Sequence, residues 1–172
     1  NGTVANRTTP GATGLPDTIV QIASGREHAY ALDDAGRIWA WGDNSRGAIG
    51  DGTSPDRPTP VRLSLTNVAE VEAGHYHGIA RRTDGSVWTW GYGALGQLGL
   101  GTTNNRTSPV QVPGITDAVA VAAGRDMSYV VRADGEFESP EDVRQVVLRA
   151  PGSTLAAGMG RVFQDVEYPV FR

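Results

Sequence analysis

Short apolar segments alternate with polar residues along most of the chain, and glycine-rich turns separate them. Two such segments, 30–32 and 38–41, flank a turn that holds Asp34 and Gly36, and the same arrangement recurs around Asp84 and Gly85. An acidic residue followed by glycine is typical of the tight turn of a β-hairpin, because glycine readily adopts positive backbone φ angles. The pattern therefore predicts a series of hairpins in an all-β chain.

The hairpins recur with a period of about fifty residues, which indicates a repeat architecture. A glycine precedes each hairpin, with spacings of 49 and 50 residues, at Gly25, Gly74 and Gly124. Two copies of Trp-x-Trp-Gly follow the turns at 39–42 and 88–91, and a glycine-rich stretch at 47–53 is matched by another at 96–102. The matches extend through the whole unit, so the chain is an array of one supersecondary motif.

These motifs closely resemble the regulator of chromosome condensation repeat, in which the leading glycine is followed by a histidine, the turn, Trp-x-Trp-Gly and Gly-Gln-Leu-Gly. The resemblance covers residues 1–137, as a partial unit 1–22, the units 23–71 and 72–121, and a partial unit 122–137. It implies a β-propeller of four-stranded blades that serves as a platform for partner proteins. We expect a partial propeller of about two and a half to three units.

An array of this length does not close on itself, because propellers need about four to eight blades. A blade draws its stability from its neighbours, and an uncovered blade face exposes apolar surface and strand edges. We therefore expect further blades or self-association to cover the end blades.

Residues 138–172 depart from the repeat, since Glu138-Ser139-Pro140-Glu141 stands where Trp-x-Trp-Gly is expected. Ser139 suits the N-cap of a helix and Pro140 its first position. Three valines, at 143, 146 and 147, form one apolar stripe at helical spacing. The tail is thus predicted to hold a short helix over about 140–149, then a strand at 161–163. Its role, as a cap on the last blade, a second domain or an altered gene end, stays open.

Composition narrows the function classes. The net charge of −4 gives no basic surface that would bind nucleic acid. The chain contains no run of 18 apolar residues, so insertion into a membrane is not predicted. There is no cysteine, which excludes disulfides, thiolate metal ligands and a thiol nucleophile. The compartment is left undetermined, and a signal peptide before Asn1 would place the chain outside the cytoplasm.

Candidate chemistry is sparse, and we predict no catalytic residue, metal or cofactor. His28 and His77 occupy one repeat position that Met127 takes in the third copy, which favours a structural role. The stretch 91–96 fits the Gly-x-Gly-x-x-Gly dinucleotide fingerprint, but no helix signal follows it to receive a pyrophosphate. Both features belong to the repeat framework.

Residues that repeat build the fold, whereas unlike residues at equivalent positions can form a binding surface. The framework set is Gly25, Gly74, Gly124, His28, His77, Trp39, Trp41, Trp88 and Trp90. The candidate binding residues directly follow the leading glycines and are Arg26, Glu27, His75, Tyr76, Arg125 and Asp126. A second candidate, on another loop, comprises residues 43–46 and Tyr92. Mixed charge and an amphipathic tyrosine suit a protein-binding patch.

The function predicted from these observations is a non-enzymatic module whose propeller loops bind a partner protein. Two alternatives remain. Resemblance to the founding member of the family implies guanine-nucleotide exchange on a small GTPase. The repeats would otherwise be an appendage of a larger enzyme.

Overall fold

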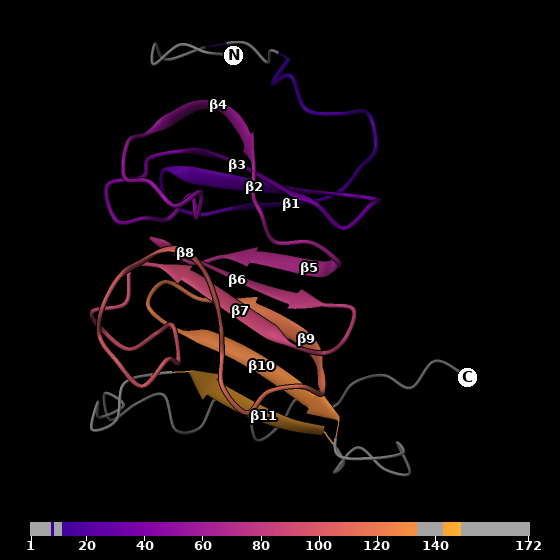
Figure 1. Cartoon of the computed structure of the whole chain (residues 1–172), viewed down its shortest axis with the longest axis vertical. Coiled ribbons are helices and arrows are strands. Elements are labelled where there is room, and N and C mark those ends of the chain that lie inside the picture. Colours follow the sequence, from indigo (N-terminus) through magenta and orange to yellow (C-terminus); the bar gives the residue numbers. More distant parts are fainter. Residues whose placement is uncertain (1–7, 9–11, 134–142, 149–172) are drawn as a thin grey trace.

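Three antiparallel β-sheets lie one after another along the long axis of the molecule, in chain order (Figure 1). The computed structural model describes residues 8, 12–133 and 143–148. The first sheet contains β1 (Ile19–Ser24), β2 (His28–Asp33), β3 (Ile38–Gly42) and β4 (Arg57–Arg62). The second contains β5 (Val68–Ala73), β6 (His77–Arg82), β7 (Val87–Gly91) and β8 (Arg106–Gln111). The third contains β9 (Ala118–Ala123), β10 (Ser128–Ala133) and β11 (Val143–Leu148).

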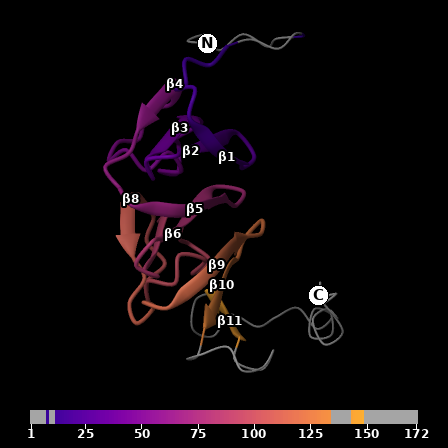
Figure 2. The same ribbon diagram turned by 90° about the vertical axis from the view of Figure 1, so that its right-hand side faces the viewer.

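Each four-stranded sheet is a blade in which every strand pairs with the next along the chain. The first strands of the blades face one another, since β1 contacts β5 and β5 contacts β9. Seen from the side, β4 and β8 lie on the opposite side from these first strands (Figure 2). The all-β partial propeller that the repeats predict is confirmed. Each leading glycine lies between the first and second strands of a blade, so a repeat unit counted from it begins with the second strand.

The hairpin turns form for the reason expected from the sequence. Gly36 has a φ of 71°, a conformation that side chains rarely tolerate. The acid that holds this turn is Asp33, whose carboxylate accepts hydrogen bonds from the backbone N–H of Ala35 at 3.1 Å and of Arg37 at 3.0 Å. Burial alone would raise the pKa of Asp33, but these bonds and one from Trp39 hold that pKa below its ordinary value.

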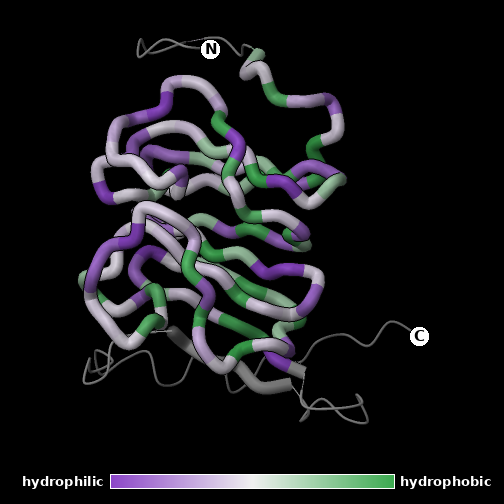
Figure 3. The backbone as a smooth tube through the Cα atoms, in the orientation of Figure 1, coloured by the Kyte–Doolittle hydropathy of each residue, from purple (hydrophilic) through white to green (hydrophobic). Residues whose placement is uncertain are grey.

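Buried apolar residues form two clusters, one between each pair of neighbouring blades. Hydrophobic stretches of the backbone recur in all three sheets (Figure 3). Alternation along a strand sends its side chains to both clusters. Ala80 packs into the cluster between the first and second blades, whereas its neighbour Ile79 packs into the cluster between the second and third. The middle blade is consequently buried on both faces.

Trp90 anchors the first of these clusters and is fully buried. Its indole N–H donates to the carbonyl of Ala48 at 2.9 Å and to the hydroxyl of Tyr30 at 3.1 Å. The Tyr30 hydroxyl also donates to the Ala48 carbonyl. The rings of Tyr30 and Trp90 meet edge to face, with centroids 5.3 Å apart. Trp39 and Trp41, on the first blade, are only half-buried.

A polar clamp joins the first strands of adjacent blades. The side-chain amide of Gln21 donates to the carbonyl of Val71 at 2.8 Å and accepts from its N–H at 3.2 Å. Glu70, one repeat later, accepts from the N–H of Val121 at 3.1 Å. Each clamp satisfies backbone groups on the edge of the following blade.

Apolar surface on β1 is left unburied, because no described blade precedes the first one. Ile22 is 67% exposed, whereas Val71, at the equivalent position of the second blade, is 0% exposed. The difference follows from the neighbouring blade, since Val71 packs against the first sheet and nothing described packs on Ile22.

The helix predicted over 140–149 is wrong for the part that the structure describes. Residues Val143–Leu148 form β11, which pairs antiparallel with β10 over the whole of both strands. β-Branched valine favours strands, and the open edge of β10 offers six residues a hydrogen-bonding partner. An isolated helix of this length gains no comparable tertiary support. The remainder of the predicted helix and the segment 161–163 lie outside the described residues.

Glycine is required at positions 25 and 74, because a histidine ring lies against each of these residues. A Cβ on Gly74 would lie 2.0 Å from Cε1 of His77, and a Cβ on Gly25 would lie 2.2 Å from Cε1 of His28. At Gly124, where Met127 replaces the histidine, the nearest atom to such a Cβ is 3.7 Å away. The glycine and the histidine three residues later thus form one packing unit.

We expect Gly74→Ala to lower the free energy of unfolding by about 2 kcal/mol, because the new methyl group overpacks the buried His77 ring. The matched variant Gly124→Ala should change it by less than about 1 kcal/mol, and in the stabilising direction, since the site has room. Urea unfolding followed by tryptophan fluorescence measures both. Equal destabilisation by the two substitutions would show that the histidine is not the cause.

Candidate functional site

The turns between the first two strands of each blade share one backbone geometry despite unlike sequences. The N–H of the leading glycine donates to the carbonyl three residues later, at 2.9 Å in all three blades. The repeated glycine therefore sets the shape of the turn, and the two residues after it are free to differ. Those two residues are the candidate binding pairs Arg26–Glu27, His75–Tyr76 and Arg125–Asp126.

Backbone hydrogen bonds connect these leading turns across the blades. The N–H of Arg26 donates to the carbonyl of His75 at 3.3 Å, and the N–H of His75 donates to the carbonyl of Arg125 at 3.1 Å. The three pairs consequently lie in one row on one side of the molecule. We call the row, together with the adjoining residues Arg46 and Tyr92, the loop surface.

Two of the pairs are local ion pairs. Arg26 Nε lies 3.2 Å from the Glu27 carboxylate, and Arg125 Nε lies 3.2 Å from that of Asp126. Such exposed pairs contribute little to stability. They do neutralise one another, so the loop surface carries no strong charge of either sign.

Tyr76 occupies the centre of the loop surface. Its hydroxyl accepts a hydrogen bond from the Arg26 guanidinium, and the ring of His75 lies 4.6 Å from its own. The Tyr76 carbonyl accepts from the N–H of Tyr92 at 2.9 Å, which joins the leading turn to the loop after β7. The two tyrosine rings meet edge to face with centroids 6.5 Å apart.

Arg46, from the loop between β3 and β4 of the first blade, reaches across to the second blade. Its guanidinium carbon lies 4.6 Å from the ring centroid of Tyr76 and 4.5 Å from that of Tyr92. The sequence separates these residues into two candidate sites on different loops, and the structure brings them into one cluster. The only signal in the sequence is that Arg46 fails to repeat, since Leu95 stands at the equivalent position.

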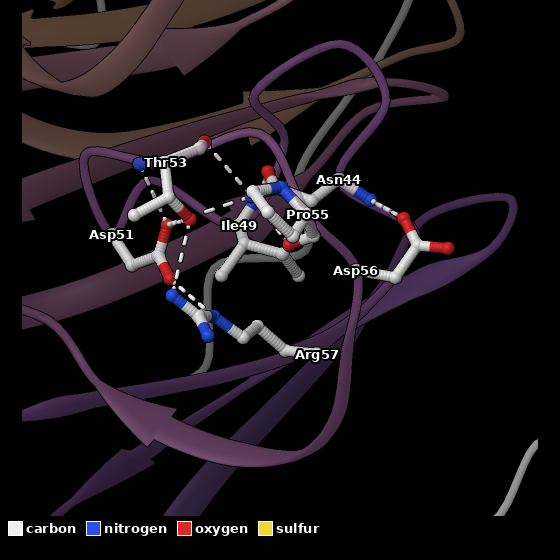
Figure 4. Close-up of polar contacts among 7 residues, drawn as sticks. All are labelled: Asn44, Ile49, Asp51, Thr53, Pro55, Asp56 and Arg57. Carbon is white, nitrogen blue, oxygen red and sulfur yellow. Dashed lines mark hydrogen bonds and ion pairs between the residues drawn. The ribbon is translucent and has the colours of Figure 1, made fainter.

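The loop that carries Arg46 is held by a polar cage around Asn44 (Figure 4). The buried Asn44 amide donates to the carbonyls of Thr53 at 2.9 Å and Pro55 at 3.1 Å, and accepts from the N–H of Ile49 at 3.0 Å. Its own N–H donates to the Asp56 carboxylate at 2.8 Å. Three other residues of the loop are thereby tied to the Asn44 side chain and a fourth to its backbone, which restricts where Arg46 can lie.

A second acid completes this cage. The carboxylate of Asp51 accepts from the N–H and the hydroxyl of Thr53, at 3.0 and 2.7 Å, and pairs with Arg57. Burial alone would raise the pKa of Asp51, but the Thr53 and Arg57 contacts keep it below its ordinary value. The carboxylate therefore stays ionised, and the loop stays closed, at neutral pH.

A shallow hollow of about 330 Å³ opens between the leading turns. Its lining comes from all three blades and comprises Ser24, Gly25, Arg26, Ala73, Gly74, His75, Ala123, Gly124 and Arg125. Glycines and alanines make up more than half of this lining, so the walls are largely backbone and small side chains. It can receive a side chain of a partner more readily than a cofactor.

The framework histidines lie beneath the loop surface and are both buried. His77 Nε2 is 3.0 Å from the Ser128 hydroxyl of the next blade. Burial lowers the pKa of each histidine to about 4, partly opposed at His28 by the charge of Asp43 and reinforced at His77 by that of His28. Both rings are neutral at physiological pH. Within the described residues no group of three or more His, Cys, Asp or Glu side chains could hold a metal ion.

The two histidines make the fold sensitive to acid. Because their pKa falls from 6.5 to about 4 on folding, their contribution to stability is complete above pH 6.5 and is lost as the pH falls toward about 4. At about pH 5 we expect the free energy of unfolding to be about 2 kcal/mol lower per histidine than at about pH 7.5. Urea titrations at the two pH values measure this. His28→Met should roughly halve the loss, and an unchanged loss would contradict the assignment.

Sequence comparison finds the same repeat. A profile described as the regulator of chromosome condensation (RCC1) repeat matches residues 35–81 and 84–131, and a second profile of that description matches 19–48 and 68–97. The human E3 ubiquitin-protein ligase HERC2 is 47% identical over 36 residues, which are 21% of this chain and 1% of the ligase. No described helix is long and apolar enough to cross a membrane.

Solved structures share the blades. Yeast RCC1 (Prp20), in its crystal structure bound to Kap60, superposes with a TM-score of 0.60 at 27% identity, over 68% of this chain and 28% of Prp20. A second structure of Prp20p from Saccharomyces cerevisiae gives a TM-score of 0.69 at 20% identity, over 88% of this chain and 37% of that one. The chain thus spans well under half of these relatives. With matching profiles over more than half of its length, it belongs to the regulator of chromosome condensation (RCC1) repeat family.

Proposed function

We propose that this chain is a non-enzymatic protein-interaction module that binds a partner protein through its loop surface. The observation that carries the proposal is the convergence of non-repeating residues from separate blades on one side of the molecule. Tyr76, Tyr92 and Arg46 meet there, although they come from three different loops. A fold that needed only its framework would place no such cluster on its surface.

The chemistry of the cluster supports protein binding. Tyrosine and arginine are enriched among the residues that dominate binding energy at interfaces, because each combines a large apolar area with hydrogen-bonding groups. The hollow between the leading turns adds a concave feature beside them. The pairs Arg26–Glu27 and Arg125–Asp126 form a charged rim, where they favour orientation over affinity.

A relative supports the same function. Prp20 is a propeller that has been crystallised with a protein, Kap60, bound to it. Related repeats thus occur in a protein that binds other proteins. The partner of this chain does not follow from that complex, because the chain spans only 28% of Prp20.

Photo-crosslinking tests the proposal directly. We expect p-benzoyl-phenylalanine at position 76 to form a specific adduct with a protein from the source cells, and Tyr76→Ala in a competitor chain to abolish competition for that adduct. The same residue at position 62, on exposed β4, is the control. Equal labelling from positions 62 and 76, or competition unaffected by Tyr76→Ala, would contradict the proposal. The thermal midpoint of Tyr76→Ala should match that of the unchanged chain, because the ring is surface-exposed in part.

The two alternative functions stay predictions. Nucleotide exchange on a small GTPase would be measured as faster release of labelled GDP in the presence of this chain. The match to the ligase HERC2 favours the other alternative, an appendage of a larger enzyme, since that protein carries a similar segment. Flanking gene sequence that encodes a catalytic domain would support it.

The outer face of the first blade also requires a neighbour that buries it. We propose that a further blade or a second copy of the chain packs on β1, where Ile22 is exposed although its equivalent Val71 is buried. Light scattering should then show that the isolated chain self-associates, and Ile22→Glu should shift it toward the monomer. A stable monomer that Ile22→Glu does not change would contradict this packing.

A further inference from the structure

Arg46 is held between two tyrosine rings before any partner binds. Its guanidinium carbon lies about equally far from the ring centroids of Tyr76 and Tyr92, at 4.6 and 4.5 Å. The rings are fixed in turn by the backbone hydrogen bond between the two tyrosines and by the Arg26 contact to the Tyr76 hydroxyl. A long side chain that is already ordered loses little further entropy on binding.

Among the described residues, the Arg46 guanidinium has no anionic partner, in contrast to the other arginines of the loop surface. Arg26 is paired with Glu27 and Arg125 with Asp126. Across the described part of the chain, the contacts of Arg46 are with the two aromatic rings, and no carboxylate pairs with it. Its N–H groups are therefore available to an acceptor from outside the chain.

The acid nearest to Arg46 in sequence is committed elsewhere. The carboxylate of Asp43 accepts hydrogen bonds from the hydroxyl of Ser45 at 2.8 Å and from its N–H at 3.2 Å. The Asn44 cage fixes the loop on both sides of these residues. Both Ser45 bonds go to one oxygen of the Asp43 carboxylate, and in the described structure this carboxylate forms no ion pair with Arg46.

The geometry selects the acceptor. The two rings meet edge to face and approach the guanidinium from different directions, so part of it stays uncovered. Two of its N–H groups can there match the two oxygens of a carboxylate. Resting on the proposed function, we infer that Arg46, Tyr76 and Tyr92 form an anchor site for a single carboxylate side chain in a segment of the partner protein. Contact with the rings strengthens the cation and excludes water from the pair.

A protein carboxylate fits this site better than the phosphates of a nucleic acid. Glu27, Asp43 and Asp126 lie on the same loops, and the chain carries a net charge of −4. The repulsion from these acids and from the net negative charge is stronger for a polyphosphate than for a single carboxylate among neutral residues. Leu95, at the position equivalent to Arg46 in the next blade, is 48% exposed and offers an apolar contact to the same segment.

Selection from a displayed library of random peptides, each about twelve residues long, tests the inference on the 172-residue chain. We expect the enriched peptides to share an Asp or Glu residue. Their affinity, measured by fluorescence anisotropy of labelled peptides, should fall by about tenfold or more with Arg46→Gln. Arg62→Gln, which removes the same charge from exposed β4, should leave the affinity unchanged. Arg46→Lys should also lose most of the binding, because an ammonium cannot form the planar, two-pronged contact.

The outcomes separate this inference from the function on which it rests. Peptides that lose binding with Tyr76→Ala but carry no acidic residue, or that bind Arg46→Gln normally, would overturn the carboxylate anchor and leave the loop surface as a binding site. Enrichment of no peptide dependent on Tyr76 would overturn both. A single-stranded DNA oligonucleotide that competes as well as the acidic peptide would show non-specific attraction of anions and would also overturn the inference. Near-ultraviolet circular dichroism confirms that each variant is folded.

Discussion

The burial of apolar surface between neighbouring blades is the constraint on which the rest of the structure depends. A sheet of four short strands has two apolar faces and cannot bury either of them alone. Trp90 shows how a neighbour solves the problem, because its ring is buried against the first blade while its N–H reaches the Ala48 carbonyl there. The Gln21 and Glu70 clamps then satisfy polar backbone groups along the seam. Every interface in the array combines these two kinds of contact.

This stacking also determines where function can arise. Since all blades present the same edges in the same direction, the turns after Gly25, Gly74 and Gly124 form one row, and backbone hydrogen bonds hold them in register. The repeated glycine fixes the shape of each turn, and the following two positions vary without cost to the fold. A surface of unlike side chains, supported by a uniform scaffold, is well suited to the recognition of another protein.

The repeat pattern predicted much of the fold, including the hairpins, the blades and the burial of the two histidines. It also identified Tyr76 and Tyr92, but as members of separate candidate sites. The helix assigned to 140–149 was wrong over β11, because local helix signals do not report the open edge of β10. Arg57 and Arg106 occupy equivalent positions in the repeat, but their contacts differ. Asp51 pairs with Arg57, whereas no described residue accepts a hydrogen bond from the buried Nε of Arg106.

By itself, the sequence determined the period, the turns and the burial pattern, because these follow from local backbone preferences and from the alternation of apolar residues. It determined as well that no thiol chemistry is available to this chain. Only the tertiary structure decided that Arg46 lies between Tyr76 and Tyr92, since three loops must meet for that contact to form. Such a contact depends on how adjacent blades are placed in space. The spacing of residues within one repeat does not reveal that placement.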